Sequence, residues 1–402
     1  MCSALGALAI ACVSLAPGAA AVDIRAKQWY LEAMKAKEMW KTSTGKGVKV
    51  AVIDTGVNPN TPSLKGQVLV KEVPKSLSYH VTQDYEGHGT TMAELIAGTG
   101  AGNGIKGLAY GAKIIPYRVV LDGLKDGREA KETPTSAEAI RAAADSDAKI
   151  INMSFGSFYY NPDEEEAIKY AASKGKLLFA AVGNEALKSK NKIEYPAFYP
   201  HVVGVSATDK SATVAKFAEH GDYIDFAAPG VDVPGWCDNK FTEYCSIRGT
   251  SAASAIASAS AALVWSAHPD WSADQVLRVL VDTAGRKWPK NRPSAYLGYG
   301  LIRPRKVLDN PNITPGPVDV DPLAAQNGTG DDDTSATPTS PATPSSSQPS
   351  KGPNSPSAPT SAVAEGPRSA SGTQAWVIIG AVAAVLVIGG AGYAVLRARR
   401  NG

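Results

Sequence analysis

Four short runs of mostly apolar, β-branched residues constrain the fold of this 402-residue chain more than any other feature. The runs cover residues 48–54, 149–156, 177–184 and 202–207. They are nearly continuous rather than alternating between apolar and polar residues, which is typical of strands buried on both faces. Strands of this kind form parallel sheets that helices cover on either side, and the apolar fraction of 44% is sufficient for such a core.

Helical patterns lie between these runs. Residues 135–146 (TSAEAIRAAADS) and 162–175 (PDEEEAIKYAASKG) begin with helix-start residues and continue with Ala-rich helical spacing. The alternation of strand and helix predicts an α/β fold, a three-layer domain with a mainly parallel sheet. Functional side chains gather at the carboxyl ends of the strands in such folds. Asp54 and Asn184 each end a predicted strand, so both are candidates.

A general base can be sought among only five histidines. His88 stands between two glycines in YEGHGTTMAELIAG and opens a predicted helix, so another segment or a substrate can approach its ring. The other four occupy a polar loop, the approach to a strand, a turn and a helix end: His80, His201, His220 and His268. His88 is therefore the candidate base, although a lone histidine more often has a structural role.

The stretch GTSAASAIAS, residues 249–258, contains no charge and no aromatic residue. It places Ser251 in the first turn of a helix that we expect to run to about Ala267. The unpaired N–H groups and the positive dipole end of that turn favour a developing anion. Small side chains allow such a helix to pass through the centre of a domain.

Each of these motifs is weak alone. An aspartate before Thr-Gly is often only a turn former. The ordered set AVIDTGV, GHGTTMAELIAG, NMSFG, AAVGNE, YPAFYP and GTSAAS is far more specific, and through it the sequence resembles the subtilisin-like serine proteases. The order Asp, His, Ser is that of subtilisin. An α/β-hydrolase would need glycine where Ala253 stands.

The resemblance implies a role for each candidate residue. Ser251 corresponds to the nucleophile and His88 to its general base, which later protonates the leaving amine. Asp54 corresponds to the residue that fixes the imidazole tautomer. The side-chain amide of Asn184 and the N–H of Ser251 would bind the oxyanion.

The resemblance also implies two substrate-binding segments. Ser154, Phe155 and Gly156 correspond to the extended segment that pairs with the substrate backbone. Tyr195, Pro196 and Ala197 correspond to part of the pocket for the residue before the cut. The helix start departs from the family pattern where a bulky residue, a proline and a glycine are usual, at Ala252, Ala255 and Ala259. These changes affect the expected efficiency and specificity, not the reaction type.

A narrower resemblance, carried by DIRAKQWYLEAMKAKEMWKTSTGKG before the first strand, is to mycosins, subtilases of type VII secretion systems. It implies association with the secretion membrane complex and an N-terminal arm, residues 22–45, that wraps the peptidase domain, residues 46–310, without blocking the site. About thirty residues between the expected signal and Asp54 are fewer than normally fold alone, so we expect no large inhibitory propeptide.

The two ends of the chain are not globular in composition. Residues 1–21 resemble a secretory signal peptide with Ala19 and Ala21 before the cut, although no basic residue precedes the apolar run. Residues 311–374 are rich in Pro, Ser and Thr and predict a disordered linker. Residues 375–396 carry no charge and predict one transmembrane helix, and the arginines of residues 397–402 place that tail in the cytoplasm.

The remaining predictions concern cysteines, cofactors and charge. Cys237 and Cys245 are close in sequence, and in an oxidising compartment such a pair predicts a disulfide. Loop carboxylates such as Asp84, Asp122 and Asp126 lack a calcium-ligand spacing, so we expect no cofactor and assign no metal. A net charge of +3 without a basic face does not suggest nucleic-acid binding.

Three functions remain compatible with the sequence. The first is a membrane-anchored extracytoplasmic serine endopeptidase that processes protein substrates of a type VII secretion system. The second is a structural stabiliser of that membrane complex, in which proteolysis is dispensable. The third is a general surface protease.

Overall fold

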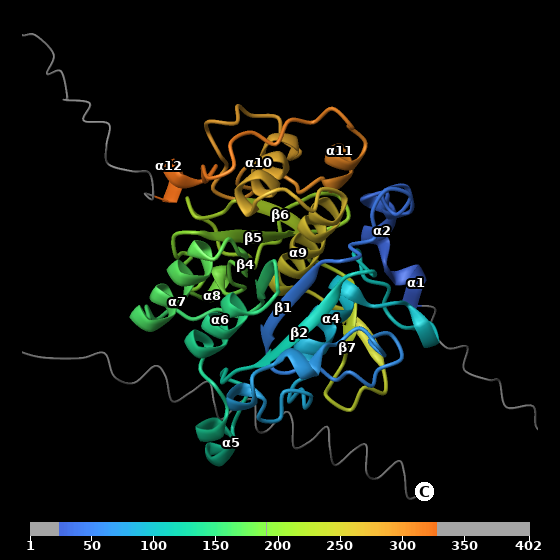
Figure 1. Ribbon diagram of the computed structural model, residues 1–402, viewed down its shortest axis with the longest axis vertical. Coiled ribbons are helices and arrows are strands. Elements are labelled where there is room, and N and C mark those ends of the chain that lie inside the picture. The colour runs from blue at the N-terminus through green and yellow to red at the C-terminus, as the bar shows by residue number, and fades with distance from the viewer. Residues whose placement is uncertain (1–23, 190, 328–402) are drawn as a thin grey trace, which may run out of the picture. The chain divides into compact units, whose positions relative to one another are not determined.

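A six-stranded parallel sheet forms the middle layer of the domain, with the strand order β2-β1-β3-β4-β5-β6, and a two-stranded antiparallel ribbon, β7-β8, lies apart from it (Figure 1). The computed structural model describes residues 24–189 and 191–327. The strands are β1 (Lys49–Asp54), β2 (Lys113–Arg118), β3 (Ile150–Met153), β4 (Leu177–Ala181), β5 (Val202–Thr208), β6 (Phe226–Pro229), β7 (Val233–Trp236) and β8 (Tyr244–Ile247).

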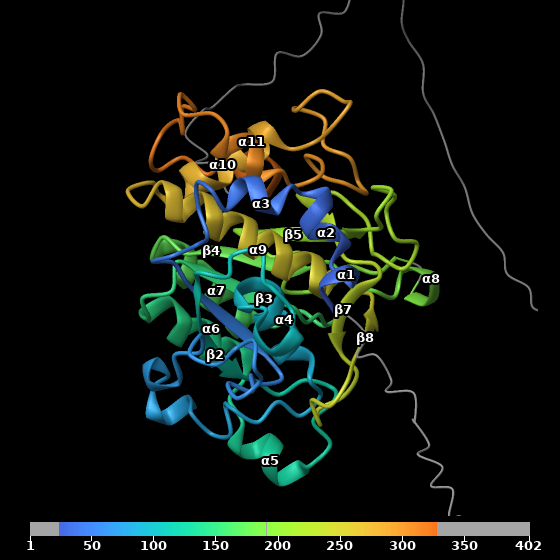
Figure 2. The same cartoon turned by 90° about the vertical axis from the view of Figure 1, so that its right-hand side faces the viewer.

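Helices cover both faces of this sheet, as the continuous apolar runs predict. On one face α4 and α9 pack against side chains such as Val50, Val52 and Phe179, and on the other face α6 and α7 cover Ala51 and Ile53 (Figures 1 and 2). The helices are α1 (Ile24–Lys27), α2 (Trp29–Ala33), α3 (Ala36–Met39), α4 (His88–Ala97), α5 (Gly127–Glu132), α6 (Ser136–Asp145), α7 (Pro162–Ser173), α8 (Ala186–Ser189), α9 (Thr250–Ala267), α10 (Ala273–Thr283), α11 (Pro304–Leu308) and α12 (Ala324–Asn327), with 3₁₀ turns η1 (Val70–Glu72), η2 (Lys75–Leu77) and η3 (Ala101–Asn103). The predicted three-layer α/β domain is confirmed.

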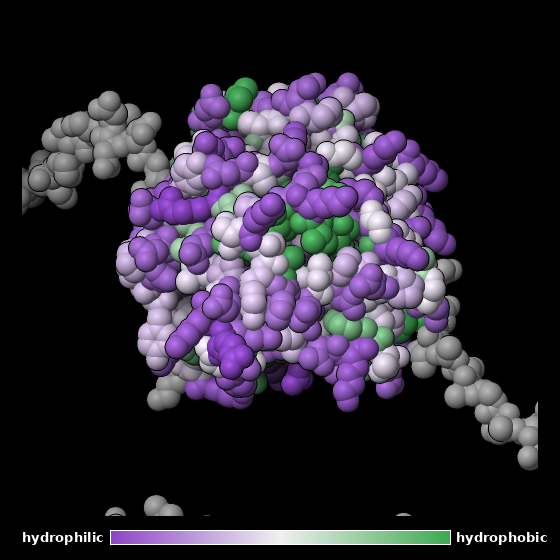
Figure 3. All heavy atoms as spheres, turned by 60° about the horizontal axis from the view of Figure 1, so that its bottom comes forward, coloured by the Kyte–Doolittle hydropathy of each residue, from purple (hydrophilic) through white to green (hydrophobic). Residues whose placement is uncertain are grey.

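Local signals set the helix bounds. Thr135 caps α6 in a capping box with Glu138, and Asn161 caps α7 ahead of Pro162. Helix α9 is buried from Thr250 to Trp265, so the small-residue stretch does pass through the core. The face turned forward in Figure 3 is mostly hydrophilic with a hydrophobic patch near its middle.

The four predicted strands correspond to β1, β3, β4 and β5, with β3 and β4 ending several residues earlier than expected. Strand β2 escaped prediction because its sequence, KIIPYR, contains Pro116. Proline cannot donate to a sheet ladder and is tolerated at an edge. Strand β2 is an edge strand, which explains how Pro116 fits there.

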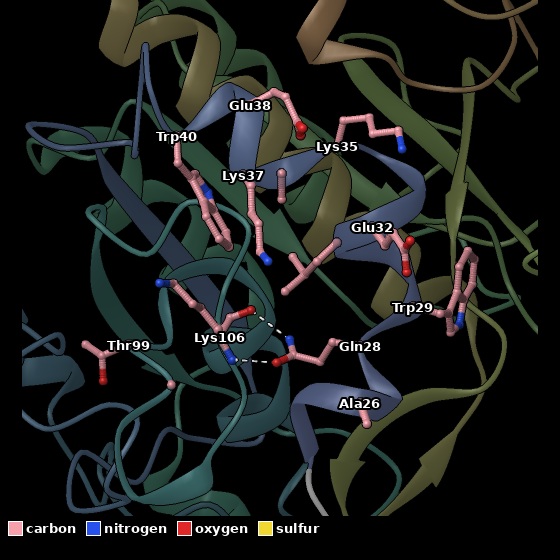
Figure 4. A pocket seen from close by; sticks show the side chains of 13 residues that line it. Ala26, Gln28, Trp29, Glu32, Lys35, Lys37, Glu38, Trp40, Thr99 and Lys106 are labelled. Atoms are coloured by element: carbon pink, nitrogen blue, oxygen red, sulfur yellow. Dashed lines mark hydrogen bonds between the residues drawn. The ribbon is translucent and has the colours of Figure 1, made fainter.

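The N-terminal arm is tied to the domain by reciprocal hydrogen bonds. Gln28 Nε2 donates to the carbonyl of Lys106 (2.7 Å), whose N–H donates to Gln28 Oε1 (3.0 Å; Figure 4). Trp40 Nε1 donates to Leu108 O (2.8 Å), and Tyr30 and Met39 are fully buried. None of the described arm residues lines the cleft that holds Ser251 and His88.

The predicted disordered linker starts too early in the chain. Residues 311–327 pack on the domain, because Leu323 is buried and the side chains of Ser272, Gln275 and Arg278 donate to backbone carbonyls of this segment. Ser272 Oγ donates to Val318 O (2.6 Å) and Gln275 Nε2 donates to Gly316 O (2.9 Å). The predicted signal peptide, the remaining linker, the membrane helix and the cytoplasmic tail lie outside the described residues. Within the described part, no helix is long and apolar enough to span a membrane.

The predicted disulfide is also wrong, because Cys237 and Cys245 are free thiols. The ribbon register pairs Gly235 with Cys245, and Cys237 N donates to Glu243 O (3.1 Å). The two cysteines are therefore diagonal neighbours in the ribbon, with their thiols close enough to form a side-chain hydrogen bond. Cys237 is exposed as a whole, but desolvation of its thiol and then the neighbouring Cys245 thiol raise its pKa to about 12.

Candidate active site

An aspartate–histidine pair lies at the carboxyl end of β1. Asp54 is the last residue of β1 and is fully buried, and His88 is the first residue of α4. His88 Nδ1 lies 2.7 Å from Asp54 Oδ1. The His88 side chain is 32% exposed, so its outer edge remains open to a substrate. This geometry fixes the proton of the neutral ring on Nδ1 and leaves Nε2 as an acceptor.

A buried polar network holds the histidine loop in place. Thr55 Oγ1 donates to Asp84 Oδ1 (2.7 Å), and Thr55 N donates to Asp54 Oδ1 (2.8 Å). Asp84 also accepts from the N–H groups of Gly87 (2.7 Å) and Thr90 (2.8 Å). Both oxygens of the loop carboxylate Asp84 are thus engaged by Thr55 and by the turn that precedes α4.

The glycine after His88 allows the loop to lie directly against β1. A Cβ atom on Gly89 would be 2.3 Å from Gly56 O and 2.9 Å from Asp54 Cβ. The glycine before it, Gly87, has φ +82°, a conformation that L side chains rarely adopt. The two glycines of the GHG sequence are therefore needed for the loop to pack against β1, as well as to leave the His88 ring accessible.

Ser251 lies in the first turn of α9 and shares one cleft with His88 and Asn184. Its Oγ donates to Ser154 O (3.0 Å), and no hydrogen bond joins it to His88 among the described residues. Catalytic hydrogen bonds are often loose in a ligand-free site and tighten when substrate binds.

Thr250 orients Asn184, and sequence reasoning missed this residue. Thr250 N donates to Asn184 Oδ1 (2.8 Å), and Thr250 Oγ1 lies 3.1 Å from the same oxygen. Because Oδ1 is engaged, the Nδ2 group of the exposed Asn184 is left for the cleft. Thr250 is fully buried at the start of α9, and a threonine beside a candidate nucleophile was the one available signal.

The two predicted substrate-binding segments lie side by side. Ser157 N donates to Tyr195 O (2.8 Å) and Tyr195 N donates to Ser157 O (2.8 Å), so the segment after β3 is joined to the one before Pro196. Phe155, Gly156 and Tyr195 line a neighbouring cleft. Pro196 and Ala197 were expected to line it too, but both are buried, with Ala197 in the hydrophobic core, and they support it from behind.

Comparison with known proteins decides which family this arrangement represents. The subtilase family, peptidase S8, matches residues 45–300, which is more than half of the chain. The chain belongs to the subtilase family. The match spans Asp54, His88, Asn184 and Ser251, and it stops before residue 311.

Curated relatives and solved structures agree with this subtilase assignment. Thermitase from Thermoactinomyces vulgaris is 32% identical over 279 residues, which cover 67% of this chain and 95% of thermitase. Subtilisin BL from Lederbergia lenta is 37% identical over 241 residues, 60% of this chain and 84% of that protein. The structure of the MycP3 protease from the type VII (ESX-3) secretion system has a TM-score of 0.57 at 28% identity, covering 70% of this chain and 88% of that one. The resemblances to subtilases and mycosins are confirmed, and this subtilase is a serine endopeptidase.

Beneath the cleft of this subtilase, a polar network connects α9 to the central strand β3. Asn152 of β3 is fully buried and its Nδ2 donates to Ser154 Oγ (2.8 Å), which donates to Ser251 O (3.1 Å). Ser254 Oγ and Ser258 Oγ of α9 both donate to Asn152 Oδ1, at 3.1 and 3.0 Å. Ser254 and Ser258 of the small-residue stretch therefore form buried hydrogen bonds, in addition to allowing close packing of α9.

Replacing Asn152 by alanine should lower the free energy of unfolding by about 2–4 kcal/mol, because two buried hydroxyls lose their acceptor. Urea unfolding would measure this. Removing the hydroxyls as well, in Asn152→Ala/Ser254→Ala/Ser258→Ala, should restore part of the loss. The control is Ser260→Ala, whose hydroxyl bonds only to Ile256 O within its own helix, with an expected loss of about 1 kcal/mol or less. A loss at Asn152 no larger than the control would contradict the network.

The charges around His88 set the pH at which it becomes a base. Burial lowers the pKa of His88, but Asp54 and then Asp84 and Glu86 favour the cation and raise the pKa to about 9. The ring accepts a proton only when neutral, so kcat/KM should rise with pH through this alkaline range. Glu86→Gln removes one negative charge and should move the midpoint of the rise to lower pH by about half a unit.

A pH–rate profile between pH 6 and about pH 10 tests this, since kcat/KM reports the free enzyme. Glu38→Gln is the matched control, because Glu38 is exposed on α3 of the arm. Its midpoint should coincide with that of the unchanged protein. A midpoint that moves upward in Glu86→Gln would show that Glu86 does not act on His88 through its charge.

Metal binding has little structural basis in the described part of this subtilase. No group of three or more His, Cys, Asp or Glu residues there could hold a metal ion. Asp126, another considered ligand, caps α5 by accepting from the N–H groups of Arg128 (2.8 Å) and Glu129 (3.1 Å).

Proposed function

We propose that this subtilase is a membrane-anchored, extracytoplasmic endopeptidase in which Asp54, His88 and Ser251 form the catalytic triad. The observation that carries the proposal is the 2.7 Å contact between Asp54 and His88, together with the cleft that His88 lines with Ser251 and Asn184. Nucleophilic catalysis by serine needs a base, a group that orients the base, and donors for the oxyanion.

The reaction begins when the Ser251 hydroxyl turns from Ser154 O toward Nε2 of neutral His88. His88 takes the hydroxyl proton as Oγ attacks the carbonyl carbon, and Asp54 stabilises the resulting imidazolium. The Nδ2 group of Asn184 and the N–H of Ser251, at the positive end of α9, stabilise the oxyanion. His88 then protonates the leaving amine, and water attacks the acyl-enzyme by the same route.

The proposed setting is a type VII secretion system. Two features support it: the resemblance of the arm sequence to mycosins, and the structural similarity to the MycP3 protease, which is described as part of such a system. We infer that residues 1–21 direct export, that residues 375–396 anchor the protein, and that its substrates are proteins exported through that system. The anchor would keep the catalytic cleft outside the cytoplasm.

The test uses the full chain in membranes of its own host, beside Ser251→Ala. A fluorophosphonate probe should label the unchanged protein at Ser251 and leave the variant unlabelled. New N-termini among the exported proteins should appear only with the unchanged protein. If the variant supports the same new N-termini, the proteolytic role fails, and restored secretion by Ser251→Ala in a deletion strain would favour a structural role in the membrane complex.

A further inference from the structure

A second cleft, of ≈ 720 Å³, adjoins the triad on the side of the predicted substrate-binding segment. Residues 120–123 and 155–162 form its walls together with Ser136, Tyr195 and several acidic side chains. It shares Glu86 with the cleft that holds His88 and Ser251. A peptide bound along Ser154 and Gly156 with its carbonyl at Ser251 would therefore place a side chain in this second cleft.

The charge of this second cleft is one-sided. None of its 18 lining residues is Lys, Arg or His. Five of them are acidic: Glu86, Asp122, Glu164, Glu185 and Glu194. Acidic residues on a surface often do no more than face water. Two of these five are buried, Glu164 and Glu194, and Glu164 has hydrogen-bond partners in Ser136 and Tyr199.

Glu194 is buried, with 7% of its surface exposed, and its carboxylate faces the cleft without a hydrogen bond or ion pair to another described residue. The carboxylate occupies space that two glycines leave open. A Cβ on Gly156 would lie 2.1 Å from Oε2, and a Cβ on Gly183 would lie 2.3 Å from Oε1. Gly183 directly precedes Asn184, so the carboxylate forms the floor of the pocket beside the oxyanion donor.

A second buried carboxylate increases the negative charge there. Glu219 is fully buried, its Cγ would lie 2.8 Å from a Cβ on Gly183, and its Oε2 has no hydrogen-bond partner. Burial and then the charges of Glu219 and Glu185 raise the pKa of Glu194 to about 7. A buried charge without a partner is unfavourable, and a cationic ligand would relieve it.

The shape of the site indicates which cation fits. The described residues offer no three-ligand group for a metal ion. An extended side chain that enters between Gly156 and Gly183 would bring an ammonium or guanidinium group to the carboxylate. A guanidinium can bind a carboxylate through two parallel hydrogen bonds.

We propose that Glu194 is the specificity-determining residue of this subtilase and selects a basic side chain, arginine or lysine, immediately before the scissile bond. The proposal rests on the proposed function, because it takes Ser251 as the nucleophile. It narrows the substrates to protein segments with exposed basic residues.

The experiment compares peptides that differ only at this position, with Arg, Lys, Gln, Leu or Glu. The full-length protein should cleave the Arg and Lys peptides with the highest kcat/KM. Glu194→Gln should lower kcat/KM for those two by about 30-fold or more, as expected when one partner of a buried charge pair is removed. Cleavage of the Leu peptide should change little. Glu166→Gln, the same change at an exposed glutamate on α7, is the control and should leave all rates as they were.

A second measurement distinguishes a loss of specificity from a folding defect in the Glu194→Gln variant. Benzamidine, a small aromatic amidinium, should inhibit cleavage of the Leu peptide by the unchanged protein, and at least 10-fold more weakly in Glu194→Gln. Equal cleavage of the Arg and Leu peptides by the unchanged protein would overturn the inference while leaving the protease intact. No cleavage of any peptide, together with no fluorophosphonate labelling of Ser251, would instead overturn the proposed function.

Discussion

Ser251→Ala should lower kcat by about 10⁶-fold, the magnitude measured for the nucleophile of subtilisin, a member of the same family. In the proposed reaction this hydroxyl forms the acyl-enzyme, and its position in the first turn of α9 is fixed by the core. Its one hydrogen bond, to Ser154 O, is worth about 1 kcal/mol, so the variant should remain folded. Peptide cleavage at high enzyme concentration measures the effect.

The control for this substitution is Ser266→Ala near the other end of α9. Its hydroxyl bonds to Lys46 O at the exposed end of the helix, remote from the cleft. It should cleave peptides at the rate of the unchanged protein. More than about 1% residual activity in Ser251→Ala, after exclusion of contaminating protease, would mean that another group is the nucleophile.

Asp54→Asn should lower kcat by about 10⁴-fold near neutral pH, with little change in KM, because the amide imposes the wrong tautomer on His88. The asparagine would donate from Nδ2 to His88 Nδ1, so the ring proton would move to Nε2, where it blocks acceptance of the Ser251 proton. Loss of the Asp54 charge should also lower the pKa of His88, because that charge favours the imidazolium. Initial rates and the NMR titration of the His88 ring measure both effects.

Asp126→Asn is a matched control, because the same change at the exposed cap of α5 leaves the cleft untouched. Its kcat should equal that of the unchanged protein. A loss of less than about tenfold in Asp54→Asn would mean that the 2.7 Å contact does not control the tautomer.

Sequence reasoning identified residues that the fold brings to one cleft, because they sit at positions that local pattern defines. Asp54 ends a buried strand, and His88 and Ser251 begin helices, so a parallel α/β fold brings them to one edge. It did not recover Thr250 or Asn152, whose importance depends on partners 66 and 102 residues away in the chain. A hydrogen bond between distant segments leaves no local pattern.

The two structural errors have similar causes. Residues 311–327 resemble the Pro-rich segment that follows, and they are held by a few anchors such as Leu323 that composition does not reveal. The cysteine pair was judged by its spacing, whereas the structure holds the two thiols as unbonded diagonal neighbours of the β7–β8 ribbon. Glu194 was overlooked because a glutamate in a loop is ordinarily solvated, and only the fold shows that it is buried.

The burial of α9 has a consequence for how this enzyme can diversify. The residues from Thr250 to Val264 have almost no room, so a larger side chain there would displace the sheet or the neighbouring helices. The walls of the second cleft lie in segments outside the regular elements, at residues 120–123 and most of 155–162, where changes of shape and charge are tolerated. The helix that carries Ser251 thus tolerates few substitutions, whereas the segments that select the substrate can change without disturbing it.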